Sequence, residues 1–284
     1  MTAPSAAVLP PPSVLAAFGL AGVPVPLPGG QGDSVRVGDA VLKPVGGEGE
    51  EKAAWAAELM AELSGDRGAR GFRVPPPVRA VGGGWVVEGW AASRFVAGAP
   101  GPGGGRGAPV DWAALLAAGR AFHRALRDAP CPGFLAAHDH PWAVADRVAW
   151  GEVAPRAAEP SVLPLLHRLL ALAEPVSAPC QLVHGDLTGN VLFAAGHPPA
   201  VIDFSPYWRP AGYADAIVAA DGLLHHGAGP QLVESAVPGE AGAPLLVRAL
   251  TFRLASPLPP QPTAMLERAA RLADELAARI GAGG

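Results

Sequence analysis

Two short apolar runs in the second half of the chain each lead to an acidic residue, and they constrain the fold more than any other part of the sequence. The first run, 181–184, leads to Asp186, and the second, 200–204, contains Asp203. Apolar runs of this length, bounded by turn residues, are typical of buried strands. We therefore expect two buried strands whose ends bring both carboxylates to one place.

A side-chain amide follows the first carboxylate closely. Asn190 ends the segment HGDLTGN, residues 184–190, which contains Asp186. Magnesium in proteins is bound through one or two carboxylates together with substrate phosphates. An Asn and an Asp near a further carboxylate therefore indicate magnesium-dependent phosphoryl transfer. The alternative for Asp186 or Asp203 alone is turn chemistry, in which the carboxylate binds nearby backbone groups.

The same residues resemble the catalytic and metal-binding loops of the aminoglycoside phosphotransferase-like family of the protein-kinase-like superfamily. HGD at 184–186 with Asn190, and IDF at 202–204, carry the resemblance. It implies that Asp186 acts as base toward a substrate hydroxyl, and that Asn190 and Asp203 hold Mg²⁺ beside ATP. It also implies an α+β, protein-kinase-like two-lobed fold. The N-lobe would be a small antiparallel β-sheet with one helix, and the C-lobe would be mainly helical.

The spacing of the first loop departs from that family. The family places four residues between the Asp and the Asn, whereas this chain has three, 187–189. A shorter loop must follow a different path, and Gly189 can supply the positive φ that such a path needs. For His184 the resemblance implies a hydrogen-bonded core histidine and not a proton shuttle.

Lysine usage singles out one candidate phosphate ligand. Lys43 and Lys52 are the only lysines, and arginine supplies every other cation. Lys43 stands near the end of the second of two strands expected within 35–45, around a Gly-Asp turn. A lysine kept where arginine is otherwise used indicates a compact point charge, which would orient the ATP phosphates. The alternative is a strand-end lysine that snorkels to solvent.

Two further segments are candidates for contacts with ATP. Gly29, Gly30 and Gly32 can bring backbone N–H groups close to phosphates, although the full kinase glycine spacing is absent. The resemblance places the adenine near Ser93 and Phe95. These five residues complete the expected nucleotide-binding set.

A helix is expected at 48–63, because its apolar residues recur at helical spacing and a glycine follows. In the kinase family a helix at this place carries the Glu that pairs with the lysine. Glu58 is the expected partner of Lys43, and Glu62 is the second choice. Lys52 is expected in a solvated first turn.

The chain is expected to have two domains. Residues 1–98 would form the N-lobe for nucleotide phosphates, with short strands within 78–96, and 99–284 would form the C-lobe with the catalytic loop, metal site and acceptor pocket. A surface loop is expected at 97–107, which is rich in Gly and Pro. Helices are expected at 112–127, capped by Asp111, and at 161–173 and 263–280.

Composition agrees with a compact enzyme of the cytoplasm. The formal charge of −4 argues against nucleic acid or a membrane surface as partner. Cys131 and Cys180 are too few for a disulfide framework or a zinc site. The first residues lack the basic start and apolar run of a signal peptide, and no segment reaches the roughly 20 apolar residues of a membrane span.

Several other residues have more than one interpretation. Asp215 resembles the family's Asp that braces the catalytic loop, and Asp221 is a weaker candidate for the same role.

The segment 206–210, with two aromatic residues and an Arg, would either line an acceptor pocket or pack as a proline-pinned loop. His123 is expected to be structural. The histidines at 138, 140, 225 and 226 lack zinc spacing, since no third ligand matches them.

The sequence thus predicts an ATP- and Mg²⁺-dependent phosphotransferase acting on a hydroxyl of a small molecule. An aminoglycoside acceptor does not follow, because such polycations need an acidic pocket and the acidic residues after Asp221 are scattered among arginines. A sugar, an amino sugar, a choline-like alcohol and a nucleoside stay open as acceptors. The alternative functions are a nucleotide-binding pseudokinase with a regulatory or scaffold role, and nucleotidyl transfer on the same fold.

Overall fold

The computed structural model describes residues 8–27, 33–45, 49–65, 71–100, 110–155, 160–239, 242–257 and 263–282. The chain divides into two compact units. The first consists of residues up to 99 together with 192–202, and the second of 100–191 together with 203–284. The expected glycine segment, with Gly29, Gly30 and Gly32, and most of the expected loop at 97–107 lie outside the described residues.

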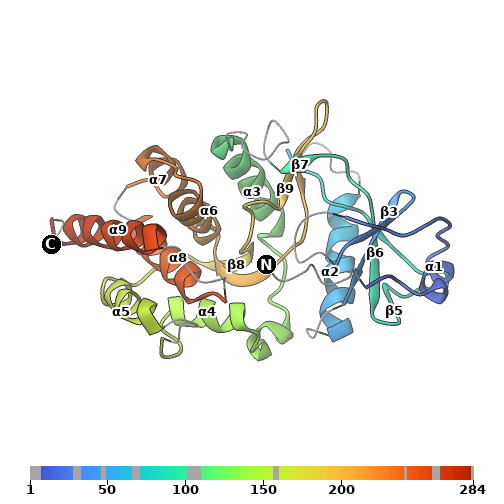
Figure 1. Ribbon diagram of the computed structural model, residues 1–284, viewed down its shortest axis with the longest axis horizontal. Coiled ribbons are helices and arrows are strands. Elements are labelled where there is room, and N and C mark those ends of the chain that lie inside the picture. The colour runs from blue at the N-terminus through green and yellow to red at the C-terminus, as the bar shows by residue number, and fades with distance from the viewer. Residues whose placement is uncertain are drawn as a thin grey trace. The chain divides into compact units, whose positions relative to one another are not determined.

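The first unit is built on an antiparallel sheet with strand order β1-β2-β3-β6-β4, and β5 pairs with β6. Its strands are β1 (Val25–Pro26), β2 (Val35–Val37), β3 (Ala40–Pro44), β4 (Pro77–Val78), β5 (Val86–Val87) and β6 (Trp90–Arg94). Two helices accompany the sheet, α1 (Pro12–Ala17) and α2 (Gly49–Ser64). The sheet and α2 are seen in blue to teal in Figure 1.

Alternation along the central hairpin explains why this sheet forms. Val35 and Val37 of β2 and Leu42 of β3 are buried, while Arg36 between the valines is only half-buried. Successive side chains of a strand point to opposite faces, so one face of the hairpin is apolar. That face packs against Val14 of α1 in a common core. The two strands predicted around a Gly-Asp turn are therefore confirmed, with Val35 paired to Leu42.

A second, three-stranded sheet has the order β10-β9-β7. Its strands are β7 (Ala99–Pro100), β9 (Val191–Phe193) and β10 (Ala200–Val201). Residues 99 and 100 were expected in a loop, so that part of the prediction is wrong. Gly98 explains the difference, because a Cβ there would lie 2.8 Å from the Cβ of Leu192. Only glycine lets the chain approach β9 this closely.

The second unit is mainly helical. Its helices are α3 (Trp112–Leu126), α4 (Pro141–Ala149), α5 (Leu163–Ala171), α6 (Ala211–His225), α7 (Pro230–Ala236), α8 (Ala243–Ala255) and α9 (Thr263–Ala282). Two 3₁₀ turns, η2 (Gly133–Ala137) and η3 (Pro160–Val162), precede α4 and α5. The helices predicted at 112–127, 161–173 and 263–280 are confirmed, and Asp111 caps α3 by accepting from the Ala114 N–H at 2.9 Å.

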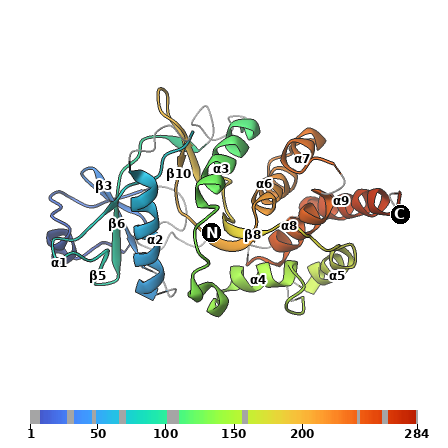
Figure 2. The same cartoon turned by 180° about the vertical axis from the view of Figure 1, so that it is seen from behind.

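The core of the second unit lies along α6 and α8, which are buried over most of their length. These two helices pack on each other, and α3, α4, α5, α7 and α9 contact one or both of them (Figures 1 and 2). Helices that are mostly apolar on all sides are typical of such central positions. The only charged residues of α8 are two arginines, Arg248 and Arg253, and both are buried.

A two-stranded ribbon lies beside these helices. β8 (Cys180–His184) pairs antiparallel with β11 (Pro206–Pro210), with Pro206 opposite His184 and Pro210 opposite Cys180. The segment 206–210, for which pocket lining and packing were both open, is thus a strand. The ring of Tyr207 packs edge-on against Phe252 of α8 at 5.7 Å between centroids.

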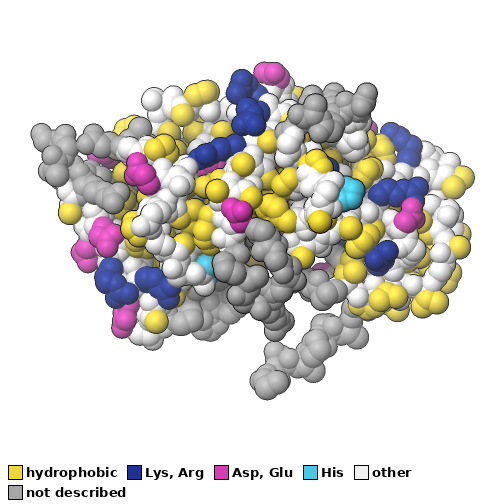
Figure 3. Space-filling model, turned by 90° about the horizontal axis from the view of Figure 1, so that it is seen from above, with side chains coloured by type: hydrophobic (Ala, Val, Ile, Leu, Met, Phe, Trp, Pro, Cys, Tyr) yellow, Lys and Arg dark blue, Asp and Glu magenta, His cyan; other side chains and the backbone are white. Residues whose placement is uncertain are grey.

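Two observations bear on larger partners. No helix of the described residues is both long enough and apolar enough to cross a membrane. On the face shown in Figure 3, the Lys and Arg side chains of the described residues lie among Asp and Glu side chains and do not gather into one basic patch. The α+β organisation predicted from the sequence is confirmed by the two units together.

Candidate active site

The loop after β8 leaves its strand through a glycine that has no room for a side chain. A Cβ at Gly185 would overlap the ring of Tyr207 on the neighbouring strand β11. The Gly185 N–H also donates to the Ser205 carbonyl at 3.0 Å. The middle residue of the HGD segment is therefore set by packing, and the next residue, Asp186, emerges from a fixed point.

The shortened loop closes as a tight turn. The Asn190 N–H donates to the Leu187 carbonyl at 2.9 Å, and Gly189 at the third position of the turn has φ 85°. A positive φ at this position of a β-turn is the conformation that favours glycine. The positive φ predicted for Gly189 is confirmed. Leu187 anchors the turn, since its buried side chain packs against Gly119 of α3.

Asp186 is held from two sides. The side-chain amide nitrogen of Asn190 donates to the Asp186 carbonyl at 2.8 Å and to its Oδ2 at 3.0 Å. The other carboxylate oxygen, Oδ1, accepts from Nη2 of Arg253 at 2.9 Å. Nearly half of the Asp186 side chain stays exposed, at 46%. The carboxylate is thus oriented by its neighbours but open to a ligand.

Arg253 connects Asp186 to a second carboxylate, that of Asp221 on α6. Its Nε donates to Asp221 Oδ1 at 2.6 Å and its Nη2 to Oδ2 at 2.7 Å. Both side chains are only 8% exposed. Burial opposes the charge of the guanidinium, but Asp221, and then Asp186, outweigh it and raise the pKa of Arg253. Planar, two-pronged pairing of this kind is the geometry for which arginine is suited.

This arrangement exchanges the roles expected for the two carboxylates of α6. Asp215 was expected to brace the catalytic loop, with Asp221 as the weaker candidate. Asp215 instead accepts from Nε of Arg120 on α3 at 2.6 Å, and it makes no hydrogen bond to the loop among the described residues. Asp221 reaches the loop through Arg253. The reason is helical periodicity: residues six apart on a helix point in directions about 120° apart around its axis.

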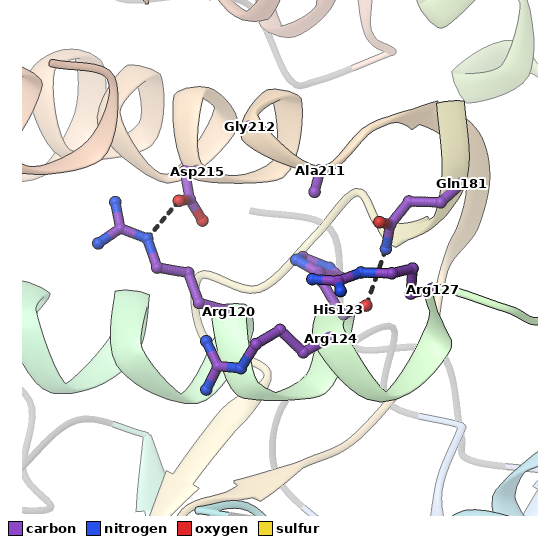
Figure 4. A pocket seen from close by; sticks show the side chains of 8 residues that line it. All are labelled: Arg120, His123, Arg124, Arg127, Gln181, Ala211, Gly212 and Asp215. Carbon is purple, nitrogen blue, oxygen red and sulfur yellow. Dashed lines mark hydrogen bonds and ion pairs between the residues drawn. The ribbon is translucent and has the colours of Figure 1, made fainter. Parts of the chain in front are cut away.

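Asp215 faces a separate hollow of about 180 Å³ between α3, β8 and the start of α6. Figure 4 shows Arg120, Arg124 and Arg127 along α3, with Arg120 reaching Asp215. On the other side the Gln181 side chain donates to the His123 carbonyl at 2.8 Å. The hollow contains none of the predicted catalytic or metal-binding residues.

Two histidines support the loop from inside. The His184 N–H donates to Nε2 of His123 at 3.0 Å, and His184 Nδ1 accepts from the N–H groups of Asp186 and Ser205 at 3.2 and 3.4 Å. Burial, and then the neighbouring His184, lower the pKa of His123 to about 3, so this imidazole is neutral. The structural roles predicted for both histidines are confirmed.

Asp203 follows β10 by two residues, as the sequence predicted, and its side chain is exposed. Its φ of 55° is unusual for a residue other than glycine, and Asp is among those that tolerate it. Such backbone strain clusters at functional sites. The next residue, Phe204, packs edge-on against the His184 ring at 5.7 Å between centroids. His184 therefore contacts the loops of both carboxylates.

In the first unit the structure places Lys43 one residue before the end of β3, near the strand end as predicted. Its side chain is exposed. Glu58 is exposed on α2, and an ion pair between it and Lys43 is not found among the described residues. Lys52 differs from its expected place. It is half-buried, and burial lowers the pKa of its ammonium group to about 8.

The expected adenine-binding residues lie along and after β6. Ser93 is paired with Val41 in the sheet, and the Phe95 N–H donates to the Asp39 carbonyl at 2.7 Å. The guanidinium of Arg36 lies 3.8 Å from the centroid of the Phe95 ring. Lys43 and Ser93 thus belong to two neighbouring strands, β3 and β6, and Phe95 follows the second of them.

Two of the other histidines make local contacts. His140 caps α4, because its Nδ1 accepts from the Ala143 N–H at 3.2 Å. His226 packs edge-on against Trp112 at 5.5 Å between centroids. Among the described residues no three His, Cys, Asp or Glu side chains are grouped so that they could hold a metal ion. A Mg²⁺ site of the nucleotide type does not need such a group, since phosphates complete it.

Comparison with known proteins shows what these units resemble. No protein-family model and no curated protein matches the sequence. An aminoglycoside phosphotransferase from Alicyclobacillus acidocaldarius matches with a TM-score of 0.60 and 16% identity, over 98% of this chain and 96% of the other. The chain has the protein-kinase-like fold of the aminoglycoside phosphotransferases.

Two further solved structures support this assignment. A ternary complex of aminoglycoside phosphotransferase APH(4)-Ia with AMP-PNP and hygromycin B has a TM-score of 0.52 and 16% identity, covering 95% and 97% of the two chains. A choline/ethanolamine kinase family protein from Mesorhizobium loti has a TM-score of 0.50 and 18% identity, covering 88% of each. The predicted two-lobed α+β fold is confirmed.

Arg253 is the residue of this site that sequence reasoning missed. It stands in the run 245–254, in which every residue but Arg248, Thr251 and Arg253 is apolar. A charged residue inside such a run is a signal, because arginine is almost never fully buried unless it is paired. The signal shows that a partner exists, but it does not say which carboxylate is the partner.

The buried carboxyl of Asp215 provides a pH-dependent prediction. Burial, opposed by Arg120, raises its pKa from 3.8 to about 6. A raised pKa stabilises the folded state at low pH, and this contribution is lost as pH rises through about 6. We therefore expect Asp215→Asn to gain roughly 2–3 kcal/mol of stability relative to the wild type between pH 4 and 7. Urea denaturation of both proteins at the two pH values measures this difference, and a difference independent of pH would contradict it.

Proposed function

We propose that this protein is an ATP- and Mg²⁺-dependent phosphotransferase that transfers the γ-phosphoryl group to a hydroxyl of a small molecule. The observation that carries the proposal is the environment of Asp186. Its carboxylate emerges from a packed loop, is oriented by Asn190 and Arg253, and lines an open cavity. A base that must meet an acceptor hydroxyl needs this combination of fixed orientation and access.

The fold supports a nucleotide and a small molecule as the two ligands. The solved APH(4)-Ia complex holds AMP-PNP and hygromycin B. In this chain Lys43, Ser93 and Phe95 would contact ATP, together with Gly29, Gly30 and Gly32. Glu58 would pair with Lys43 once the nucleotide is bound.

The residues available for magnesium suit that ion. Asn190 uses its amide nitrogen in both hydrogen bonds to Asp186, so its side-chain oxygen is left to act as a ligand. Asp203 contributes an exposed carboxylate. Both are the hard oxygen donors that Mg²⁺ takes in nucleotide sites. When bound, the magnesium ion would neutralise negative charge on the ATP phosphates.

The chain's own part in the reaction is mostly positioning. Asp186 accepts the proton of the acceptor hydroxyl, while Arg253 and Asn190 hold the carboxylate and each of its oxygens keeps a lone pair. Phosphoryl transfer needs little covalent chemistry from the protein, so orientation and charge stabilisation supply most of the rate. The acceptor would occupy the cavity of about 210 Å³ lined by Asp186, Thr188, Asp221, His225, His226 and Arg253.

The direct test is incubation with ATP labelled at the γ-phosphate, Mg²⁺ and a library of alcohols. Transfer of label to an acceptor supports the proposal, and transfer to water alone supports only nucleotide hydrolysis. The second candidate, a nucleotide-binding regulator without transferase activity, is favoured by one observation. Both oxygens of Asp186 already accept hydrogen bonds in this structure. Nucleotide binding with no label on any acceptor or in water would establish it.

Lysine substitutions test the nucleotide assignment. Lys43→Ala is expected to weaken ATP binding about 10- to 100-fold, because a charge-assisted hydrogen bond to phosphate contributes about 1.5–3 kcal/mol. Lys52→Ala is the matched control and is expected to leave ATP affinity unchanged. Isothermal titration calorimetry with Mg-ATP measures both. A large effect at Lys52, or none at Lys43, would show that the wrong lysine was assigned.

A further inference from the structure

We propose that Arg253 sets the charge of the acceptor cavity, so that the cavity selects an uncharged acceptor with several hydroxyl groups, such as a sugar or polyol, over a polycation. The inference rests on the proposed phosphotransferase function and names the acceptor class for it. It comes from the contacts of Arg253 with the two carboxylates of the cavity, Asp186 and Asp221.

The first argument is the charge of the cavity wall. Asp186 and Asp221 contribute −2 and Arg253 contributes +1, so these three groups sum to −1. Burial lowers the pKa of His225, which keeps that imidazole uncharged at neutral pH. Without Arg253 the same wall would carry −2 and would favour ammonium groups. One arginine therefore halves the net negative charge of this wall.

The second argument is hydrogen-bonding capacity. All four carboxylate oxygens of Asp186 and Asp221 already accept a bond, three of them from Arg253 and one from Asn190. An ammonium group would have to compete with the guanidinium for these oxygens, and it would bring a second positive charge close to the first. An acceptor hydroxyl needs only one remaining lone pair on Asp186.

The third argument is the rest of the lining. Thr188 Oγ1 is buried and has no hydrogen-bond partner among the described residues. The imidazoles of His225 and His226 complete the cavity. The Thr188 hydroxyl both donates and accepts, as the hydroxyls of an acceptor do. A hydroxyl-rich ligand would therefore find partners that an ammonium group, which only donates, cannot use fully.

The experiment uses pairs of a neutral and a cationic acceptor. Glucose and glucosamine differ in one charge, and hygromycin B and spectinomycin represent larger cations beside neutral disaccharides. Mg-ATP-dependent phosphorylation of each is followed by mass, and kcat/KM is compared within each pair. For the wild type we expect a preference of at least about 10-fold for the neutral members. Arg253→Lys, which keeps the charge, is expected to retain that preference.

Two variants are expected to move the preference toward the cations by about 10-fold or more. Arg253→Met removes the positive charge and keeps much of the side-chain volume. Because this variant leaves Asp221 buried and unpaired, its folding is at risk. His226→Glu adds a carboxylate to an exposed position of the same wall and leaves the buried pair intact, so it tests the same point in a folded protein.

Arg248→Met is the matched control. Arg248 stands on the same helix and is buried to a similar degree, but its guanidinium donates to the carbonyls of Ala149 and Glu174 at 3.0 and 2.9 Å and does not line the cavity. This variant is expected to lose stability with no change in acceptor preference. If destabilisation of α8 alone changed the acceptor preference, Arg248→Met would change that preference as well.

The outcomes separate the inference from the function on which it rests. A wild-type preference for cationic acceptors would overturn the inference and leave the phosphotransferase intact. An unchanged preference in both Arg253→Met and His226→Glu would also overturn it. If the wild type phosphorylates no member of any pair, the inference is overturned, and the screen with the alcohol library decides separately whether the proposed function stands.

Discussion

Asp186→Asn is expected to lower the rate of phosphoryl transfer by about 10²- to 10⁴-fold, which is the usual contribution of a general base. The variant keeps the size of the side chain and one oxygen for Arg253, so the loop should stay folded. It cannot take up the acceptor proton at neutral pH. The affinity for Mg-ATP, measured by calorimetry, is expected to stay close to that of the wild type.

Asp203→Asn is the variant with which Asp186→Asn is compared, because it separates a metal ligand from a general base. Asp203 is assigned to the metal, so its substitution should remove the magnesium dependence of nucleotide binding as well as the activity. A base and a metal ligand thus differ in which constant changes, kcat or the nucleotide Kd. If both variants lose nucleotide equally, Asp186 is not a dedicated base.

Arg209→Met is expected to destabilise the fold by about 3–5 kcal/mol, since it leaves a buried carboxylate without its partner. Arg209 on β11 donates to Asp146 Oδ2 from Nη2 at 2.6 Å and from Nε at 3.0 Å, and to Glu152 Oε1 at 2.7 Å. The side chains of Arg209 and Asp146 are only 15% and 7% exposed. The guanidinium also lies 4.7 Å from the ring centroid of Trp150, which adds a cation–π contact.

An exposed ion pair of the same length is the control. Arg94 and Asp39 approach to 2.7 Å, but their side chains are 49% and 75% exposed. Arg94→Met should therefore cost only about 0–1 kcal/mol. Urea denaturation of the two variants beside the wild type measures the contrast. Equal losses would mean that burial of the Arg209 pair is not what stabilises β11.

Local pattern was sufficient to predict much of the fold from the sequence. The hairpin of β2 and β3 and the amphipathic helix α3 are encoded by periodicity and by the Asp111 cap, which are properties of neighbouring residues. The positive φ of Gly189 followed from counting residues in one loop. These features depend on contacts over a few positions, and a single sequence contains them directly.

The unpredicted parts depend on contacts between distant residues. Arg253 binds Asp186 across 67 positions, and nothing in either local segment specifies the other. The choice between Asp215 and Asp221 depended on which side of α6 faces the loop. Lys52 was expected in solvent because it follows two acidic residues, whereas its burial depends on packing that the helix pattern does not contain.

The two hydrogen bonds accepted by His184 Nδ1 have a consequence for how the binding of one ligand affects the binding of the other. One imidazole nitrogen is shared by the N–H of Asp186 and the N–H of Ser205, and Ser205 stands two residues after Asp203. A backbone shift in either loop changes the geometry of the shared acceptor and is felt by the other loop. Binding at the metal side and binding at the acceptor side would then be thermodynamically linked, each altering the affinity of the other by the same factor. A buried histidine that takes no part in the chemistry would in this way make the binding of the two substrates cooperative.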